Sequence, residues 1–244
     1  MTALSVNINK VALIRNARGG SIPNVVQVAK DCVSFGADGI TVHPRPDQRH
    51  IRYQDVRDLK EALSVELNVE GYPSEAFLSL MQEVRPSQCT LVPDPPDVLT
   101  SDTGWDTGKH KHFLLAIIQR LQALGIRTSL FVDTSFDSLE HARDIGTDRI
   151  ELYTGPYAEA YTEGNTALIE AYSRAGEYAT ELGMGVNAGH DLNLDNLETF
   201  HSNLPFLEEV SIGHALISDA LYLGLKETIH QYQSCLGKKI QASA

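Results

Sequence analysis

Acidic residues and histidines stand at positions of the sequence where they could transfer protons. His43 closes the apolar run GITVH, and Glu70 follows the apolar residues of LNVEG. An imidazole and a partly buried carboxyl group can both titrate near neutral pH, which general acid/base catalysis requires. A core histidine and an arginine-paired glutamate are the alternatives. Glu151 in RIELYTG has the same placement, although an orienting ion pair would also explain it.

A cluster of cationic residues follows His43 in an otherwise acidic chain. The segment HPRPDQRHIR contains Arg45, Arg49, His50 and Arg52. The planar guanidinium group presents two donors to a phosphate or a carboxylate, so the cluster predicts an anion-binding site. A solvated face at the start of a helix is the alternative.

Two histidines directly follow glycines near the end of the chain. His190 occurs in VNAGHDL, and His214 occurs in SIGHAL. Glycine lets the backbone approach a ligand closely. The N–H groups of Gly213 and His214, ahead of a helix expected to begin near Ser218, could bind a phosphate. Two tight turns with incidental histidines are the alternative.

The same residue types could bind a metal ion or form a Schiff base. Three ligands could come from a set of five residues: His43, Glu70, Asp133, His190 and His214. The first expected strand has no HxH pattern, and arginines crowd His43, so we expect no metal. Lys10 is the one lysine near an expected strand end and a weak candidate for Schiff-base chemistry.

A repeating pattern places these residues at equivalent positions. Short runs rich in β-branched residues recur, and a stretch with apolar residues at i, i+3 and i+4 follows each of them. Glycines in FGAD, LGIR, IGTD and LGMG mark helix ends. The eight expected strands cover residues 5–14, 38–44, 66–72, 88–94, 127–133, 148–155, 184–190 and 208–216.

Alternating strands and helices predict a parallel sheet covered by helices. Eight units of about 30 residues in a chain of 244 favour a single (β/α)8 barrel, an α/β TIM barrel over residues 1–244. A doubly wound open sheet is the alternative, but no GxGxxG follows the first strand. Barrel active sites lie at the carboxyl ends of the strands. The long loop over residues 93–112 is expected to be a lid, with Thr100 as a phosphate donor.

The composition restricts the partners and the compartment. The chain has 20 Lys and Arg against 32 Asp and Glu, a net charge of −12, whereas a nucleic-acid surface requires a basic face. The apolar run FLLAII is far too short to span a bilayer, and the first residues do not resemble a signal peptide. Three widely spaced cysteines fit a reducing compartment. We expect a soluble cytoplasmic protein with no nucleic-acid or membrane partner.

Several segments together resemble the pyridoxine 5′-phosphate synthase family. They run in order from Val6 to about Gly224 and so cover nearly the whole chain. Each motif is weak alone, but RNARG, TVHxRxDxRHI and VNAGH in combination are highly specific. The segments are VNINKVALIRNARGG, DGITVHPRPDQRHI, LNVEG, IELYTG, VNAGHDL and SIGHAL.

The resemblance implies a (β/α)8 barrel that assembles as a homo-octamer and acts as a transferase in vitamin B6 (pyridoxal phosphate) synthesis. The implied reaction condenses 3-amino-2-oxopropyl phosphate with 1-deoxy-D-xylulose 5-phosphate. Its products are pyridoxine 5′-phosphate, phosphate and water, and no metal or organic cofactor is used. Taken by themselves, the residues also fit another phosphate-handling barrel enzyme, an isomerase or aldolase, or a non-catalytic barrel that binds sugar phosphates.

The resemblance also implies roles for single residues. His43, Glu70 and His190 correspond to acid/base residues, with His190 as a proton donor, and Glu151 corresponds to a residue that assists the transition states. Contacts to the amino-ketone phosphate are implied for Asn7, Arg18, Gly213 and His214. Contacts to the deoxyxylulose phosphate are implied for Arg45, His50 and Thr100.

The chain departs from the family pattern at two places. The pattern has Asp-His where this chain has Asn9 and Lys10, and it has Gly where this chain has Asp191. We expect Asn9 and Lys10 to contact substrate with altered chemistry, and Asp191 to contribute its main chain alone.

Overall fold

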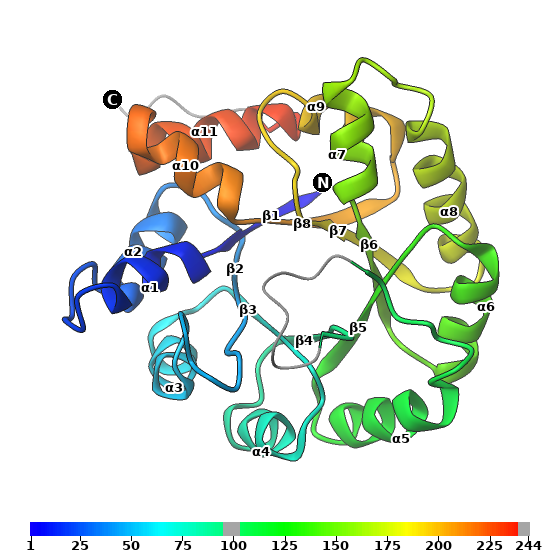
Figure 1. The fold of residues 1–244 in the computed structure, drawn as a ribbon, viewed down its shortest axis with the longest axis horizontal. Coiled ribbons are helices and arrows are strands. Elements are labelled where there is room, and N and C mark those ends of the chain that lie inside the picture. The colour runs from blue at the N-terminus through cyan, green and yellow to red at the C-terminus, as the bar shows by residue number, and fades with distance from the viewer. Residues whose placement is uncertain (95–102, 239–244) are drawn as a thin grey trace.

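The computed structural model describes residues 1–94 and 103–238. Eight parallel strands form a closed barrel in which each strand pairs with the next along the chain and the last pairs with the first (Figure 1). The (β/α)8 barrel expected from the repeats is therefore confirmed. The strands are β1 (Ala3–Asn7), β2 (Gly39–Val42), β3 (Glu66–Gly71), β4 (Gln88–Leu91), β5 (Arg127–Val132), β6 (Arg149–Tyr153), β7 (Gly185–Gly189) and β8 (Leu207–Ile212).

Eleven helices lie in the described residues, three more than one per strand. The extra helices start almost directly after β1, β6 and β8 and precede the longer helices of those units (Figure 1). No helix of the described chain is long and apolar enough to cross a bilayer. The helices are α1 (Asn9–Asn16), α2 (Val25–Ser34), α3 (Tyr53–Ala62), α4 (Glu75–Val84), α5 (Lys111–Gln122), α6 (Phe136–Ile145), α7 (Gly155–Thr162), α8 (Ile169–Glu181), α9 (Leu197–Asn203), α10 (His214–Leu223) and α11 (Leu225–Cys235).

Two of the expected boundaries are wrong. β1 ends at Asn7, because the side chain of Asn7 accepts a hydrogen bond from the backbone N of Asn9 at 3.0 Å and turns the chain into α1. α10 begins at His214, four residues earlier than expected, and the N–H of Ile217 donates to the carbonyl of Gly213 at 3.0 Å. Both helices therefore begin at the carboxyl ends of their strands.

The strands direct apolar side chains toward the helices and polar ones toward the barrel axis. Leu4 and Ile40 belong to the apolar cluster that the strands share with the helices. Alternate residues of a strand point to the opposite face. On the face toward the barrel axis, the hydroxyl oxygens of Ser5 and Thr41 lie 2.7 Å apart, and the side-chain amide of Asn68 donates to the hydroxyl of Thr41 at 3.4 Å. The same alternation directs polar residues at the strand ends into the mouth of the barrel.

The second half of the loop after β4 is anchored to the barrel. The indole N–H of buried Trp105 donates to the carbonyl of Leu91 at 2.9 Å, and its backbone N–H donates to the carbonyl of Phe131 at 2.8 Å. A Cβ on Gly104 would lie 2.6 Å from backbone atoms of Val132, so this close approach requires glycine. These contacts tie residues 103–105 to β4 and β5.

Candidate active site

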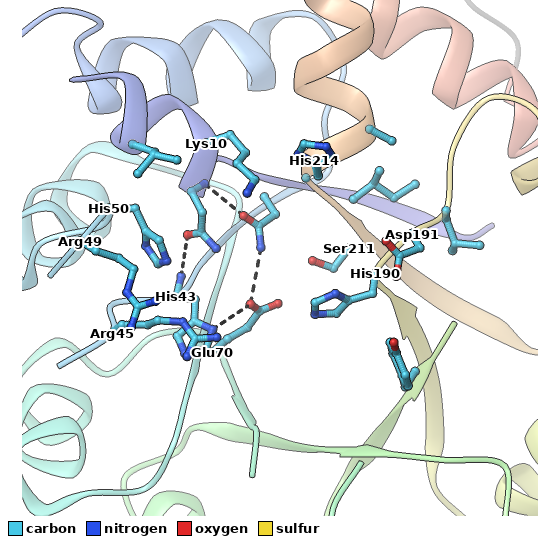
Figure 2. A pocket seen from close by; sticks show the side chains of 18 residues that line it. Lys10, His43, Arg45, Arg49, His50, Glu70, His190, Asp191, Ser211 and His214 are labelled. Carbon is cyan, nitrogen blue, oxygen red and sulfur yellow. Dashed lines mark hydrogen bonds and ion pairs between the residues drawn. The ribbon is translucent and has the colours of Figure 1, made fainter. Parts of the chain in front are cut away.

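A cavity of about 540 Å³ opens at the carboxyl ends of the strands (Figure 2). It lies where the (β/α)8 architecture places catalytic sites. Most of the residues singled out from the sequence line it, although they come from five separate parts of the chain. They are Asn7, Asn9, Lys10, His43, Arg45, His50, Glu70, His190, Asp191, Gly213 and His214.

Glu70 and His43 form the centre of one wall. Glu70 is the penultimate residue of β3, and its Oε2 lies 3.7 Å from Nδ1 of His43, which follows β2. The side-chain amide of Asn7 donates to the same oxygen at 3.5 Å. Burial raises the pKa of Glu70 to about 7, and the negative charge of Asp94 also raises it, whereas Arg45 and a hydrogen bond from Ser211 lower it. Glu70 is therefore poised to hold or release a proton at neutral pH.

The imidazole of His43 is held neutral. Burial lowers the pKa of His43 well below its ordinary value, and the positive charge of Arg45 lowers it further. The backbone N–H of His43 donates to the side-chain oxygen of Asn9 at 2.9 Å, which fixes the end of β2 against the start of α1. Asn9, which was expected to contact substrate, thus also supports the backbone of His43. A neutral imidazole next to a protonatable carboxyl can accept a proton in catalysis.

Three residues of the cationic cluster, Arg45, Arg49 and His50, lie on the same side of the cavity as His43 (Figure 2). Nη2 of Arg45 lies 3.0 Å from Oδ2 of Asp94, and both side chains are buried. Burial lowers the pKa of His50 to about 4. Nδ1 of His50 accepts a hydrogen bond from the N–H of Ile51 at 2.9 Å, so the neutral ring carries its proton on Nε2. This wall therefore offers a guanidinium and a neutral N–H donor to an anion.

The four cationic residues of the sequence cluster do not all face the cavity. Arg49 lines it and also bonds Asp47 at 2.8 Å. Arg52 does not line it, because its guanidinium donates to Asn16 at 2.9 Å. Arg15 was not singled out from the sequence. Its guanidinium donates to the backbone carbonyl of His50 at 3.1 Å and so stabilises the segment that carries the cluster.

The opposite wall carries the two glycine–histidine pairs (Figure 2). The ring of His190 lies 5.5 Å from that of Phe131 and 5.8 Å from that of Tyr153, measured between centroids. Burial lowers the pKa of His190, and the negative charge of Asp191 partly opposes this. Gly213 and His214 begin α10, whose first N–H groups are free of helical partners. A phosphate is stabilised at such a position.

A glycine stands where β8 meets α10. A Cβ on Gly213 would lie 3.0 Å from Cβ of Asn7 and 3.2 Å from its carbonyl oxygen. A side chain at these distances would make Asn7 give way by a few tenths of an ångström, so glycine eases the close approach of β8 to β1. The start of α10 therefore reaches the cavity next to Asn7.

Three of the expected site residues are not placed in the cavity. Glu151 is buried but does not line it, and burial raises its pKa well above the ordinary value, with the charge of Glu70 raising it further. Arg18 lies exposed in the turn after α1. Thr100 lies outside the described residues. Glu151 therefore lies outside the cavity wall, where burial and the charge of Glu70 favour the protonated form of its carboxyl group.

The structure adds residues that the sequence reasoning missed. Ser211 and Tyr153 line the cavity, and Asp94 pairs with Arg45. Strand alternation could have identified Ser211, because it stands two residues before Gly213 and so points to the same face. No sequence pattern marks Arg15, because its role depends on the loop around His50, which is distant from it in the sequence. The described residues contain no group of three or more histidine, cysteine or acidic side chains placed to hold a metal ion.

Solved structures share the fold of this chain. A phosphoribosylanthranilate isomerase from Thermotoga maritima superposes with a TM-score of 0.61 at 15% identity, covering 97% of this chain and 99% of that one. A 3-keto-L-gulonate-6-phosphate decarboxylase from Vibrio cholerae superposes with a TM-score of 0.68 at 12% identity, covering 97% of each chain. At these identities the likeness concerns the fold alone.

Sequence comparisons are far more specific. Residues 4–238 match the family described as pyridoxal phosphate biosynthesis protein PdxJ. A pyridoxine 5′-phosphate synthase from Porphyromonas gingivalis is 59% identical over 236 residues, which is 97% of this chain and 99% of the relative. One from Bacteroides fragilis is 58% identical over 97% of this chain and 100% of the relative. The chain therefore belongs to the PdxJ family of pyridoxine 5′-phosphate synthases.

Proposed function

We propose that the cavity at the barrel mouth carries out the ring-closing condensation of pyridoxine 5′-phosphate synthesis. Its substrates are 3-amino-2-oxopropyl phosphate and 1-deoxy-D-xylulose 5-phosphate, and its products are pyridoxine 5′-phosphate, phosphate and water. The observation that carries this assignment to the cavity is the pair of Glu70 and His43, 3.7 Å apart, between two walls suited to anions. The reaction proceeds without a metal or an organic cofactor.

Each wall of the cavity binds the phosphate group of one substrate. Arg45 and His50 present a guanidinium and an N–H donor to the phosphate of deoxyxylulose phosphate. Asn7 and the first N–H groups of α10, at Gly213 and His214, receive the phosphate of the amino ketone. Holding both substrates in one cavity supplies the proximity and orientation that a two-substrate condensation requires.

Every covalent step of this reaction moves a proton. The amine attacks the ketone, water leaves, phosphate is expelled, and an aldol-type closure followed by dehydration completes the ring. Glu70, with a pKa of about 7, can accept and return protons, and neutral His43 acts as a base beside it. A bound phosphate raises the pKa of His190 by its negative charge, so that His190 can act as the donor once substrate is present. Glu151, whose own pKa is raised by burial and by the charge of Glu70, assists the transition states from outside the cavity.

The remaining contacts are assigned by position. Lys10 and Asn9 border the cavity at the start of α1 and contact the deoxyxylulose phosphate, and Asp191 contributes backbone groups next to His190. Thr100 serves the same phosphate as Arg45. One catalytic domain covers residues 1–244, and the free cysteines Cys32, Cys89 and Cys235 fit a cytoplasmic location.

The chain also acts as a homo-octamer. α10 ends in an exposed apolar segment in which Leu221 is 75% and Tyr222 is 90% exposed, and α1 beside it exposes Ile14. Exposed apolar residues gathered in this way mark a protein interface. Arg18 follows α1 and lies outside its own cavity, so it contacts the amino-ketone phosphate of a neighbouring copy.

One experiment distinguishes this function from its alternatives. The purified protein is mixed with both substrates, and phosphate release and the absorbance of a pyridine ring are followed together. We expect equal amounts of both products, and no product when either substrate is left out. An isomerase or aldolase would form no pyridine ring, and borohydride would trap substrate on Lys10. A barrel that only binds sugar phosphates would release no phosphate.

A further inference from the structure

His190 stands in an unusual backbone turn at the end of β7. Its φ is +72°, and that of Asp191 is +32°, so two successive residues with side chains adopt the left-handed region. Such a turn is sterically unfavourable and persists only where surrounding groups hold it. The direction of the His190 imidazole therefore depends on whatever fixes this turn.

The hydroxyl of Thr154 bonds the turn directly. Its Oγ1 lies 2.7 Å from the carbonyl oxygen of Gly189 and 2.7 Å from that of His190. Carbonyl oxygens only accept, so the single hydroxyl proton is shared between the two. The backbone N–H of Thr154 also donates to the carbonyl of Gly189, at 3.1 Å. Thr154 is fully buried and directly follows β6, so it ties the end of one strand to the turn after the next.

The hydroxyl of Thr154 does not make the hydrogen bond that is usual for threonine at its position in a helix. It is the N-cap of α7, where a threonine hydroxyl usually accepts a hydrogen bond from an N–H in the first turn. Its side chain makes no such bond here. Pro156 stands in that first turn and has no N–H to offer. The hydroxyl is therefore committed to the carbonyls of the His190 turn.

The other side of the turn is held separately. The side-chain amide of Asn196 donates to the carbonyl of Asp191 at 3.2 Å. The rings of Phe131 and Tyr153 pack against the imidazole. The carbonyl of His190 also accepts from the backbone N–H of Leu192, and the hydroxyl of Thr154 is the side-chain group that bonds it.

We propose that Thr154 is a positioning residue for His190. Its hydroxyl holds the left-handed turn and thereby aims the imidazole into the cavity. The inference rests on the proposed function, because it assumes that His190 transfers a proton there.

Two substitutions separate the hydroxyl from the shape of the side chain. Thr154→Val keeps the branched shape and removes the donor, while the carbonyl of Gly189 keeps its bond from the backbone N–H of residue 154. We expect the kcat of Thr154→Val to fall by roughly 10- to 100-fold, the size of effect that misplacing a reacting group by about 1 Å can have. Thr154→Ser, which keeps the donor, should stay within about threefold of the unmodified protein.

A matched control tests whether the loss of any buried hydroxyl hydrogen bond lowers kcat to the same extent. Thr2 is buried at the opposite end of the barrel, and its hydroxyl donates to the carbonyl of Leu207 at 2.8 Å. Thr2→Val should lower the melting temperature as much as Thr154→Val while leaving kcat unchanged. An equal loss of kcat in Thr2→Val would show that general destabilisation, and not the position of His190, explains the effect.

A double-mutant cycle tests whether Thr154 acts through His190. If it does, Thr154→Val should change the kcat of His190→Asn by less than about threefold, because the group that it positions is already gone. The same fold-loss in both backgrounds would overturn the proposal. So would an unchanged kcat in Thr154→Val alone.

A crystal structure of Thr154→Val gives a readout that does not depend on activity. We expect the backbone of His190 to leave the left-handed region and its ring to move away from the cavity. An unchanged turn would overturn the proposal whatever the kinetics show. If instead His190→Asn were fully active, the proposed role of His190 would fail, and this structure would still decide whether Thr154 positions the turn.

Discussion

Nδ1 of His43 lies 3.7 Å from Oε2 of Glu70, although the two residues end different strands and stand 27 positions apart in the sequence. Burial acts on them in opposite directions. It lowers the pKa of the imidazole and raises that of the carboxyl to about 7. Both groups therefore prefer to be uncharged, and a proton can move between them and a substrate at neutral pH.

Removing either group should abolish proton transfer without unfolding the protein. We expect His43→Asn and Glu70→Gln to lower kcat by about 10²- to 10⁴-fold, the usual contribution of a general acid or base. Both variants should still fold, since both replacements are close in shape, and the melting temperature of His43→Asn should change little. His201→Asn, in α9 and outside the cavity, is the control and should keep full activity. Near-normal turnover in either site variant would contradict the acid/base assignment.

Glu70 also makes stability depend on pH in a predictable direction. Its pKa is raised to about 7 in the folded state, so the stability that its protonated form contributes is complete below its unfolded pKa and is lost as the pH rises through 7. Glu70→Gln cannot ionise. We expect it to gain on the unmodified protein between pH 5 and pH 8, by on the order of 3 kcal/mol in the free energy of unfolding.

Urea unfolding at the two pH values measures this gain. Glu83→Gln is the control, because Arg57 donates to this exposed carboxylate and lowers its pKa, which reverses the sign. A stability difference between Glu70→Gln and the unmodified protein that stays constant with pH would refute the raised pKa.

Arg45 should govern affinity for one substrate. Arg45→Ala should raise the KM for deoxyxylulose phosphate at least tenfold, because a charge-assisted pair with a phosphate is lost. It should also destabilise the protein by about 3–5 kcal/mol, since the buried carboxylate of Asp94 loses its arginine. Adding Asp94→Asn should restore the stability but should leave the KM raised.

Arg52→Ala is the control, because the guanidinium of Arg52 bonds Asn16 outside the cavity. This variant should leave the KM for deoxyxylulose phosphate unchanged. Equal KM values in the two arginine variants would remove Arg45 from this role.

Asp191 combines a strained backbone with a useful charge. Asp191→Gly should stabilise the protein by up to about 1 kcal/mol, because glycine adopts a φ of +32° without steric cost. It should also lower the pKa of His190, which the carboxylate raises. The limb of the kcat–pH profile that reports His190 should then move to lower pH. Asp191→Asn should move the limb equally without the gain in stability. An unmoved limb in both variants would show that the carboxylate does not act on His190.

Arg18 should act on a neighbouring copy. Arg18→Ala and His43→Asn should each be nearly inactive alone. If the two are expressed together with different tags and mixed assemblies are isolated, about a quarter of the sites should combine intact partners and recover activity. Mixed assemblies as inactive as the parents would place Arg18 in its own cavity. Tyr222→Glu should reduce the assembly size in analytical ultracentrifugation.

Local sequence was sufficient for the architecture and for most of the residues that line the cavity. The fold followed from eight runs of β-branched residues, each followed by an amphipathic stretch. Few arrangements of such alternating segments bury the apolar side chains of both the strands and the helices. His43, Glu70 and Gly213 could be identified because each stands where a buried strand ends, and barrel closure brings all such ends together. The expected ends of β1 and the start of α10 were wrong, because an Asx turn and a strand-to-helix junction are decided by single hydrogen bonds.

Only the tertiary structure decided which of these groups face one another and how deeply each is buried. Glu70 and Glu151 both stand near the end of a buried strand, yet Glu70 lines the cavity and Glu151 does not. Arg18 belongs to a site motif but lies exposed in the turn after α1, and Thr154 bonds a turn 36 residues further along the chain. Sequence spacing determines which strand end a residue occupies. The pKa of a residue and its partners depend on distances and desolvation, which exist only once the barrel has closed.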